Sequence, residues 1–200
     1  MIEDFLNMAF PAIALLSLLV YLPVYCIKRR RYGRRPWMRH LAIYALIGTV
    51  LSVLYATIFA YGWAFLDAQY HFLNLTPFVW LQRTYEMGMG RMIEQLLLNI
   101  AMMIPLGFLL PVVFRSLRRW WRSGLWVMAL SACIEVAQYF IGRSADIDDL
   151  LMNVLGGLIG YLVAALLHRR LGNKRWWRRL CNEPDGQIEG RQKPPENPQG

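Results

Sequence analysis

The sequence predicts an all-α integral membrane protein with about five transmembrane helices and a polar cup on the outer side of the membrane that they cross. Apolar residues make up 56% of the 200 residues, and the mean hydropathy is +0.30. A soluble domain of this length cannot bury that much apolar surface. Long apolar runs alternate with arginine clusters, and a polar stretch at residues 131–160 lies between and inside two of these runs. Together these observations indicate a polytopic membrane protein.

Five apolar runs define the expected spans, because each approaches the length that a helix needs to cross a hydrocarbon core. In chain order they cover residues 9–27, 41–65, 93–114, 124–141 and 150–167. Acidic residues precede the first run and basic residues follow it, which is the reverse of a cleaved signal peptide. We therefore expect the first run to remain as a membrane anchor.

Basic residues follow the first, third and fifth spans. Segments 28–39, 115–122 and 169–179 hold seven, four and six of them, seventeen of the chain's 22. Cytoplasmic loops carry such an excess, so we expect the amino terminus outside the cell and the carboxyl terminus in the cytoplasm. Because these charges lie at the ends of apolar runs, membrane lipids are the expected partners and nucleic acid is not.

Three regions are expected along the chain. They are an amino-terminal anchor with its basic loop (1–40), a membrane domain (41–180) and a disordered polar tail (181–200). Before the third span, residues 72–81 are amphipathic and interrupted by Pro77, so we expect them in the headgroup zone. Residues 87–90, Met-Gly-Met-Gly, are expected to form a flexible joint.

Polar side chains fall in the outer halves of the last three spans under this topology. They are Asn99 in the third span, Glu135 and Gln138 in the fourth, and Asn153 in the fifth. Ser131, Glu135 and Gln138 are three or four residues apart, as are Asp149 and Asn153, so each set shares a helix face. The turn between the last two spans adds Arg143, Asp146, Asp148 and Asp149. We expect an antiparallel hairpin with the polar face inward, in which Gly156 and Gly160 permit close approach of two helix backbones.

These residues have structural roles open to them as well as functional ones. Glu135 and Arg143 can form a structural ion pair, although ionisable groups inside membranes also mark functional sites. The aspartates can cap the fifth helix, whose amino-terminal end favours acids. The amide side chains can join helices by hydrogen bonds. A divalent cation is a further alternative that we do not favour, since nothing in the sequence fixes a ligand count.

Four segments together resemble the VanZ-like family of bacterial membrane proteins. They are NLTPF at residues 74–78, Asn99 followed by IPLGFLLP at 104–111, SxxxExxQ at 131–138, and RxxDxDDxxxNxxGGxxG at 143–160. The resemblance adds Asn74 and its loop to the candidate site. It implies an association with low-level teicoplanin resistance for the family's name-giving member, and it implies no established reaction.

We interpret the cup as a site that acts on a cell-envelope component, such as a lipid headgroup or a lipid-linked peptidoglycan precursor. The candidate acid–base residues are Glu135, Asp146 and Asp149. The candidate binding residues are Asn74, Asn99, Ser131, Gln138, Arg143, Asp148 and Asn153. Transport of a small solute or lipid and a structural role beside other envelope proteins are the alternatives. Transport is disfavoured because transporters place their sites near the membrane midplane.

Overall fold

The computed structural model describes residues 9–32, 36–59, 73–78 and 89–183, and most of these residues are helical. Among them, four apolar helices are long enough to cross a membrane: Trp37–Phe59, Ile93–Val113, Trp120–Phe140 and Ile147–Leu171. The first expected span corresponds to a shorter apolar helix, Pro11–Ile27. The expected class, an all-α polytopic membrane protein, is thereby confirmed.

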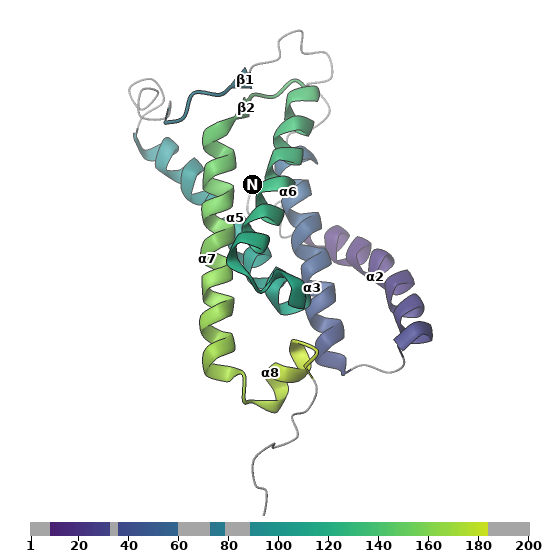
Figure 1. Cartoon of the computed structure of the whole chain (residues 1–200). Helices are drawn as coiled ribbons and strands as arrows, with labels where there is room; N and C mark the ends of the chain where they lie inside the picture. Colours follow the sequence, from purple (N-terminus) through teal and green to yellow (C-terminus); the bar gives the residue numbers. More distant parts are fainter. Residues whose placement is uncertain (1–8, 33–35, 60–72, 79–88, 184–200) are drawn as a thin grey trace, which may run out of the picture.

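The long helices follow the expected spans, with shifts at their ends. They are α2 (Phe10–Tyr32), α3 (Trp37–Leu54), α5 (Met89–Val113), α6 (Trp120–Phe140) and α7 (Ile147–Leu171). Three shorter helical elements were not predicted: the π-helix η2 (Tyr55–Phe59), the 3-10 turn η4 (Arg115–Leu117) and the helix α8 (Arg175–Leu180). Figure 1 places α8 at one end of the molecule and the two short strands at the other.

Several expectations fall wholly or partly outside the described residues. These are the last part of the second span (60–65), residue 72 and residues 79–81 of the amphipathic segment, and residues 184–200 of the tail. Of the joint expected at 87–90, the first two residues also lie outside, whereas Met89 and Gly90 are the first residues of α5. Helix α5 therefore begins inside the segment that we expected to be a flexible joint.

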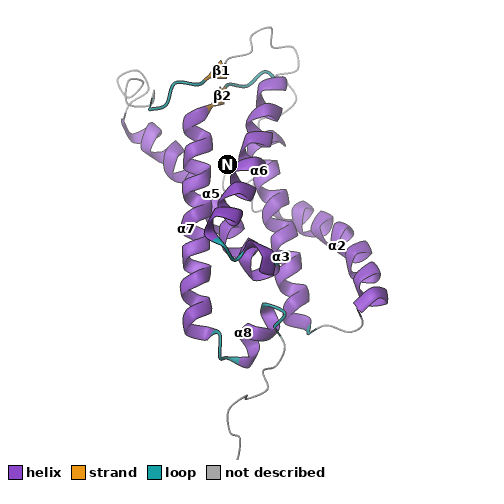
Figure 2. Ribbon diagram, in the orientation of Figure 1, coloured by secondary structure: helices purple, strands orange, loops and turns teal. Residues whose placement is uncertain are grey.

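Two short strands close one end of the helical bundle, as Figure 2 shows. Strand β1 (Leu73–Asn74) pairs in parallel with β2 (Ala145–Asp146), and Asn74 lies opposite Asp146. Strand β2 directly precedes α7, so this pairing places the segment around Asn74 over the amino-terminal end of that helix. The parallel pairing was not predicted.

Helices α5 and α7 meet backbone to backbone through glycine. A Cβ atom on Gly156 would lie 2.2 Å from the carbonyl oxygen of Ile100, and one on Gly160 would lie 2.1 Å from that of Ile104. On the facing helix, a Cβ atom on Gly107 would lie 2.0 Å from a carbonyl oxygen of α7. The close backbone approach at Gly156 and Gly160 is confirmed, but the expectation that it lies within the hairpin of α6 and α7 is wrong, because the partner helix is α5.

Helix α6 packs on another face of α7. A Cβ atom on Gly157 would lie 2.6 Å from Cγ1 of Val127 in α6. Nearer the strands, Nδ2 of Asn153 donates a hydrogen bond to Oγ of Ser131 over 2.9 Å. The expected antiparallel hairpin of α6 and α7 is therefore present, with Asn153 and Ser131 turned toward each other.

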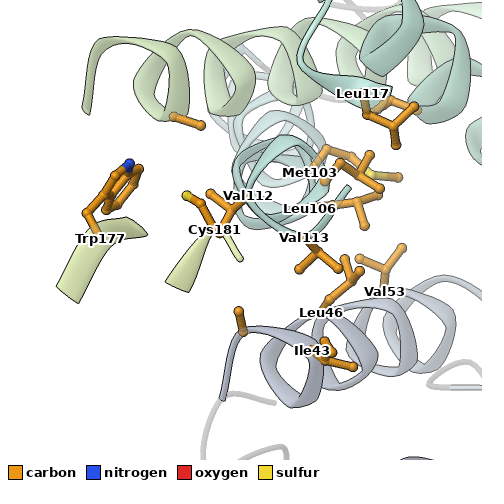
Figure 3. Close-up of a cluster of buried hydrophobic side chains, with 14 of the residues drawn as sticks. Ile43, Leu46, Val53, Met103, Leu106, Val112, Val113, Leu117, Trp177 and Cys181 are labelled. Carbon is orange, nitrogen blue, oxygen red and sulfur yellow. The ribbon is translucent and has the colours of Figure 1, made fainter. Parts of the chain in front are cut away.

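The apolar core lies around α5. In Figure 3, Leu106 and Val113 of α5 point toward Leu46 and Val53 of α3, while Trp177 lies to one side. Leu106 and Val53 are each only 2% exposed. Between helices in lipid, such contacts gain dispersion energy from close packing, because lipid tails are as apolar as the side chains.

Arg39 joins three elements at the end away from the strands. Its Nη1 donates to the carbonyl oxygen of Val112 over 3.0 Å and to that of Leu180 over 3.3 Å, and its Nη2 donates to Val113. The last carbonyls of a helix lack partners within the helix and carry partial negative charge. Arg39, which is buried, therefore caps α5 and holds α8 against it.

The glycine contact makes a testable prediction for Gly160→Ala. The added methyl group would meet the backbone of α5, which cannot move aside as a side chain can. We expect a loss of about 1–3 kcal/mol, the usual cost of overpacking, seen as a lower Tm of the purified protein in detergent. Gly124→Ala is the matched control, because its Cβ atom would lie 3.4 Å from Cδ2 of Leu158. Equal Tm values for the two variants would contradict the contact.

Candidate functional site

The predicted site residues gather at the end of the bundle where the strands lie. Helix α6 contributes Ser131, Glu135 and Gln138 near its carboxyl end, and α7 contributes Asp148, Asp149 and Asn153 near its amino end. Each set follows helical spacing, so the antiparallel hairpin brings the two sets together. We call these six residues, with Asn74, Asn99, Arg143 and Asp146, the polar site.

Asp146 organises the start of α7. As the N-cap residue, it accepts a hydrogen bond at Oδ1 from the backbone N–H of Asp148 over 3.0 Å. This contact satisfies an amide that has no partner within the helix. The backbone N–H of Asp146 itself donates to Oε2 of Glu135 over 2.9 Å. The capping role expected for one of the aspartates is thus confirmed at Asp146, and Glu135 fixes the position of the cap.

The segment that contains β1 is tied to α7 by two side-chain contacts. Nδ2 of Asn74 lies 3.1 Å from both Oδ1 and Oδ2 of Asp146. The backbone N–H of Phe78, which has a φ of 64°, donates to Oδ1 of Asp148 over 2.7 Å. Both acceptors are carboxylates, and bonds to charged acceptors are stronger than bonds between neutral groups. Asn74 therefore lies in the site that the sequence resemblance assigned to it.

Two further polar contacts connect the helices beneath the strands. Nδ2 of Asn99 in α5 donates to Oδ1 of Asp149 over 2.7 Å, and Asn153 of α7 donates to Ser131 of α6. These are the hydrogen bonds between helices that we considered as a structural role for the amides.

Thr57 belongs to this end of the bundle although the sequence reading missed it. Its carbonyl oxygen accepts hydrogen bonds from Nε2 of Gln138 over 3.1 Å and from Nη1 of Arg143 over 2.7 Å. Thr57 lies in the π-helix η2, and π-helical turns often occur at functional sites. The group of Thr57 that accepts these hydrogen bonds is its backbone carbonyl, and side-chain patterns in a sequence do not reveal backbone acceptors.

We considered Glu135 as the structural partner of Arg143. In the structure, Nη1 of Arg143 binds the carbonyl oxygen of Thr57, and Glu135 accepts from the amide of Asp146. Each residue thus has a backbone partner. The positively charged guanidinium group joins η2 to the turn after α6.

The polar site has a buried part and a part open to its surroundings. Asn74, Ser131, Glu135, Gln138, Asp148 and Asn153 are buried. Asn99, Arg143, Asp146 and Asp149 are half-buried. A ligand that approaches this end can therefore touch both positive and negative charge, at Arg143 and at Asp146 and Asp149.

Two buried oxygen atoms of this site have no hydrogen-bond partner among the described residues. They are Oδ2 of Asp148 and Oδ1 of Asn153. Leaving a buried acceptor unsatisfied costs about 1–3 kcal/mol. Because both atoms are acceptors, they are suited to hydrogen-bond donors of a ligand. In the described part of the chain, no three His, Cys, Asp or Glu residues are arranged to hold a metal ion.

The fold and the site define a class: a polytopic membrane protein with carboxylate and amide side chains gathered at one end of its helices. The sequence profile of the VanZ/LLP1 family matches residues 41–168. The chain belongs to the VanZ/LLP1 family. The match begins within α3, includes α5 and α6 and ends within the last turn of α7, whereas α2 and α8 lie outside it.

One similar protein is Protein VanZ of Enterococcus faecium. It is 31% identical over 104 residues, which are 52% of this chain and 58% of that protein. The chain thus spans less than two thirds of this relative's length. No solved structure matches the chain.

The contact between Asn74 and Asp146 predicts the effect of Asn74→Asp. This change keeps the size of the side chain and replaces a donor by a second carboxylate beside Asp146. A hydrogen bond to a charged group contributes about 1.5–3 kcal/mol, so amide hydrogen exchange in segment 73–78 should become at least about tenfold faster. Thr76→Val is the control, because Thr76 is exposed and its described contact uses the backbone N–H. Unchanged exchange in Asn74→Asp would show that this contact does not hold the segment.

Proposed function

We propose that this chain acts on a cell-envelope component at the extracytoplasmic face of the bacterial cytoplasmic membrane. In this arrangement the polar site opens outward, the amino terminus is outside and the carboxyl terminus is in the cytoplasm. The basic residues after α7 lie at the end opposite the strands (Figure 1). This arrangement supports the proposed orientation, because cytoplasmic ends carry the excess of Lys and Arg.

The observation that carries the proposal is the convergence of half-buried charged groups at the end of apolar helices. Arg143, Asp146 and Asp149 keep part of their surface exposed. Half-buried Asn99 bonds to the carboxylate of Asp149, and buried Glu135 bonds to the backbone amide of Asp146. Ionisable groups inside membrane-spanning segments are costly and often mark functional sites, and Asp149 lies within the apolar helix Ile147–Leu171. A site of this kind is suited to a headgroup that carries both an anionic group and hydrogen-bond donors.

The chemistry follows from the three half-buried groups. The guanidinium group of Arg143 can bind a phosphate or carboxylate of a lipid headgroup or of a lipid-linked peptidoglycan precursor. Asp149 and Asp146 can accept hydrogen bonds from hydroxyl or amine groups of the same ligand, or transfer a proton. Glu135 is buried and binds the amide of Asp146, so it serves as a positioning residue. By altering the envelope components that glycopeptides encounter at the outer leaflet, this action would contribute to low-level teicoplanin resistance.

A structural role is the second candidate, and one observation favours it. Glu135, Asp146, Asp148 and Asp149 each accept a hydrogen bond from another part of this chain. Such contacts can serve only to hold the helices and β1 together. The two candidates differ in one respect: a structural role predicts that conservative substitutions lower abundance, whereas a functional role predicts stable but inactive variants.

The experiment uses Glu135→Gln and Asp149→Asn in a strain in which the parent chain raises the minimal inhibitory concentration of teicoplanin. Both changes keep the shape of the side chain and remove its charge. We expect the inhibitory concentration to fall to that of the strain without the gene, with membrane abundance within about twofold of the parent. Arg115→Gln is the control, since Arg115 is an exposed arginine outside the polar site.

Two results would count against the proposal. Stable variants that protect as well as the parent would show that the polar site is not the working site. Loss of protection in proportion to loss of protein would favour the structural role. Quantitative immunoblotting of membrane fractions separates the two results.

A further inference from the structure

The chain places a compact positive segment at the end opposite the polar site. Residues 168–183 include the end of α7, the helix α8 and the residues that follow. The exposed basic side chains in this segment are Arg169, Arg170, Lys174, Arg175 and Arg179. The only acid between residues 168 and 183 is Glu183, and it already forms an ion pair with Arg118. The segment, which we call the basic foot, therefore carries positive charge that its own sequence does not neutralise.

Helix α8 has an anchored side. Trp177 is only 2% exposed, and its Nε1 donates a hydrogen bond to Nδ1 of His168 over 3.0 Å. Its ring also packs against Phe108 of α5, with 6.5 Å between ring centroids. The carbonyl oxygen of Leu180 accepts from buried Arg39 over 3.3 Å. These contacts fix α8 to α3, α5 and α7, so its outer side has a defined direction.

The outer side of α8 combines an aromatic ring with positive charge. Trp176 is 44% exposed, and its ring lies nearly perpendicular to that of Trp177, with the centroids 5.6 Å apart. Lys174 and Arg175, which directly precede it, are exposed. Tryptophan prefers the boundary between headgroups and acyl chains, and Lys and Arg attract anionic headgroups. Nucleic acid would explain the charge, but it would not explain an exposed tryptophan beside long apolar helices.

We infer that the basic foot binds the phosphate headgroups of anionic phospholipids in the membrane that the helices cross. Arg175 and Lys174 supply the charge, while Trp176 lies at the level of the headgroups and Trp177 anchors α8 to the protein. The site is distinct from the polar site, because it lies at the other end of the molecule (Figure 1). It also lies outside the segment that matches the VanZ/LLP1 profile, residues 41–168, except for its first residue.

The test measures lipid retention by native mass spectrometry. The full chain is purified in detergent and titrated with phosphatidylglycerol or with zwitterionic phosphatidylcholine. Each basic residue near a charged headgroup contributes about fivefold in affinity, so Lys174→Gln with Arg175→Gln should weaken phosphatidylglycerol binding by about 25-fold. Binding of phosphatidylcholine should remain unchanged. Arg29→Gln with Arg30→Gln, which removes two exposed charges from α2, is the matched control and should have a much smaller effect.

A second variant keeps the test informative if the double substitution impairs folding. Arg175→Lys retains the charge and should bind phosphatidylglycerol as the parent does, whereas Trp176→Ala should weaken retention of both lipids. Equal losses in the foot variant and in the α2 control would show attraction by overall charge and would overturn the inference. The same conclusion would follow if the foot variant lost no affinity for phosphatidylglycerol while its Tm stayed at the parent value.

Discussion

The backbone contact between α5 and α7 is the constraint on which the rest of the structure depends. Gly107, Gly156 and Gly160 leave no room for a Cβ atom between these helices. Near this contact, Nδ2 of Asn99 in α5 donates a hydrogen bond to Oδ1 of Asp149 in α7 over 2.7 Å. A larger residue at the contact would separate the helices and lengthen that bond. In lipid, where apolar surface gives no driving force for association, such packing and the polar contacts beside it hold the helices together.

The polar site is built outward from this contact in layers. Ser131 and Asn153 connect α6 to α7 below, and Glu135 holds the amide of Asp146 above. Over them, Asn74 and the amide of Phe78 bind aspartates at the start of α7. Each layer satisfies polar groups that would otherwise be costly beside lipid. The same arrangement leaves Arg143, Asp146 and Asp149 partly exposed, and for this reason a binding role is proposed for them.

Much of this arrangement could be predicted from local rules. Hydropathy predicted the long helices, and spacing of three and four residues placed Glu135 and Gln138 on one face of α6. The acidic residues before α7 predicted its cap, which proved to be Asp146. The small residues Gly156 and Gly160 predicted a close helix contact, but we expected it within the hairpin of α6 and α7, and spacing alone could not identify α5 as the partner. The orientation of the chain and its action on an envelope component stay predictions.

The features that sequence reasoning missed depend on backbone groups and on contacts distant in the chain. The carbonyl oxygen of Thr57 receives Gln138 and Arg143 within a π-helical turn, and no side chain marks such a turn. Strands β1 and β2 contain two residues each, which is too short for an alternating pattern to indicate. The helix α8 is short and highly basic, so it gives no span-like signal. Its position became evident only through the contacts of Arg39 and Trp177.

The central claim is that the polar site acts on a component of the cell envelope. Its most direct test is mass spectrometry of membrane lipids and peptidoglycan precursors from cells with the gene, without it, and with Glu135→Gln. If the polar site acts on such a component, the amount or mass of at least one species should change with the parent gene and return to the gene-free pattern with the stable variant. Identical profiles in all three strains, with the parent protein abundant in the membrane, would contradict the claim.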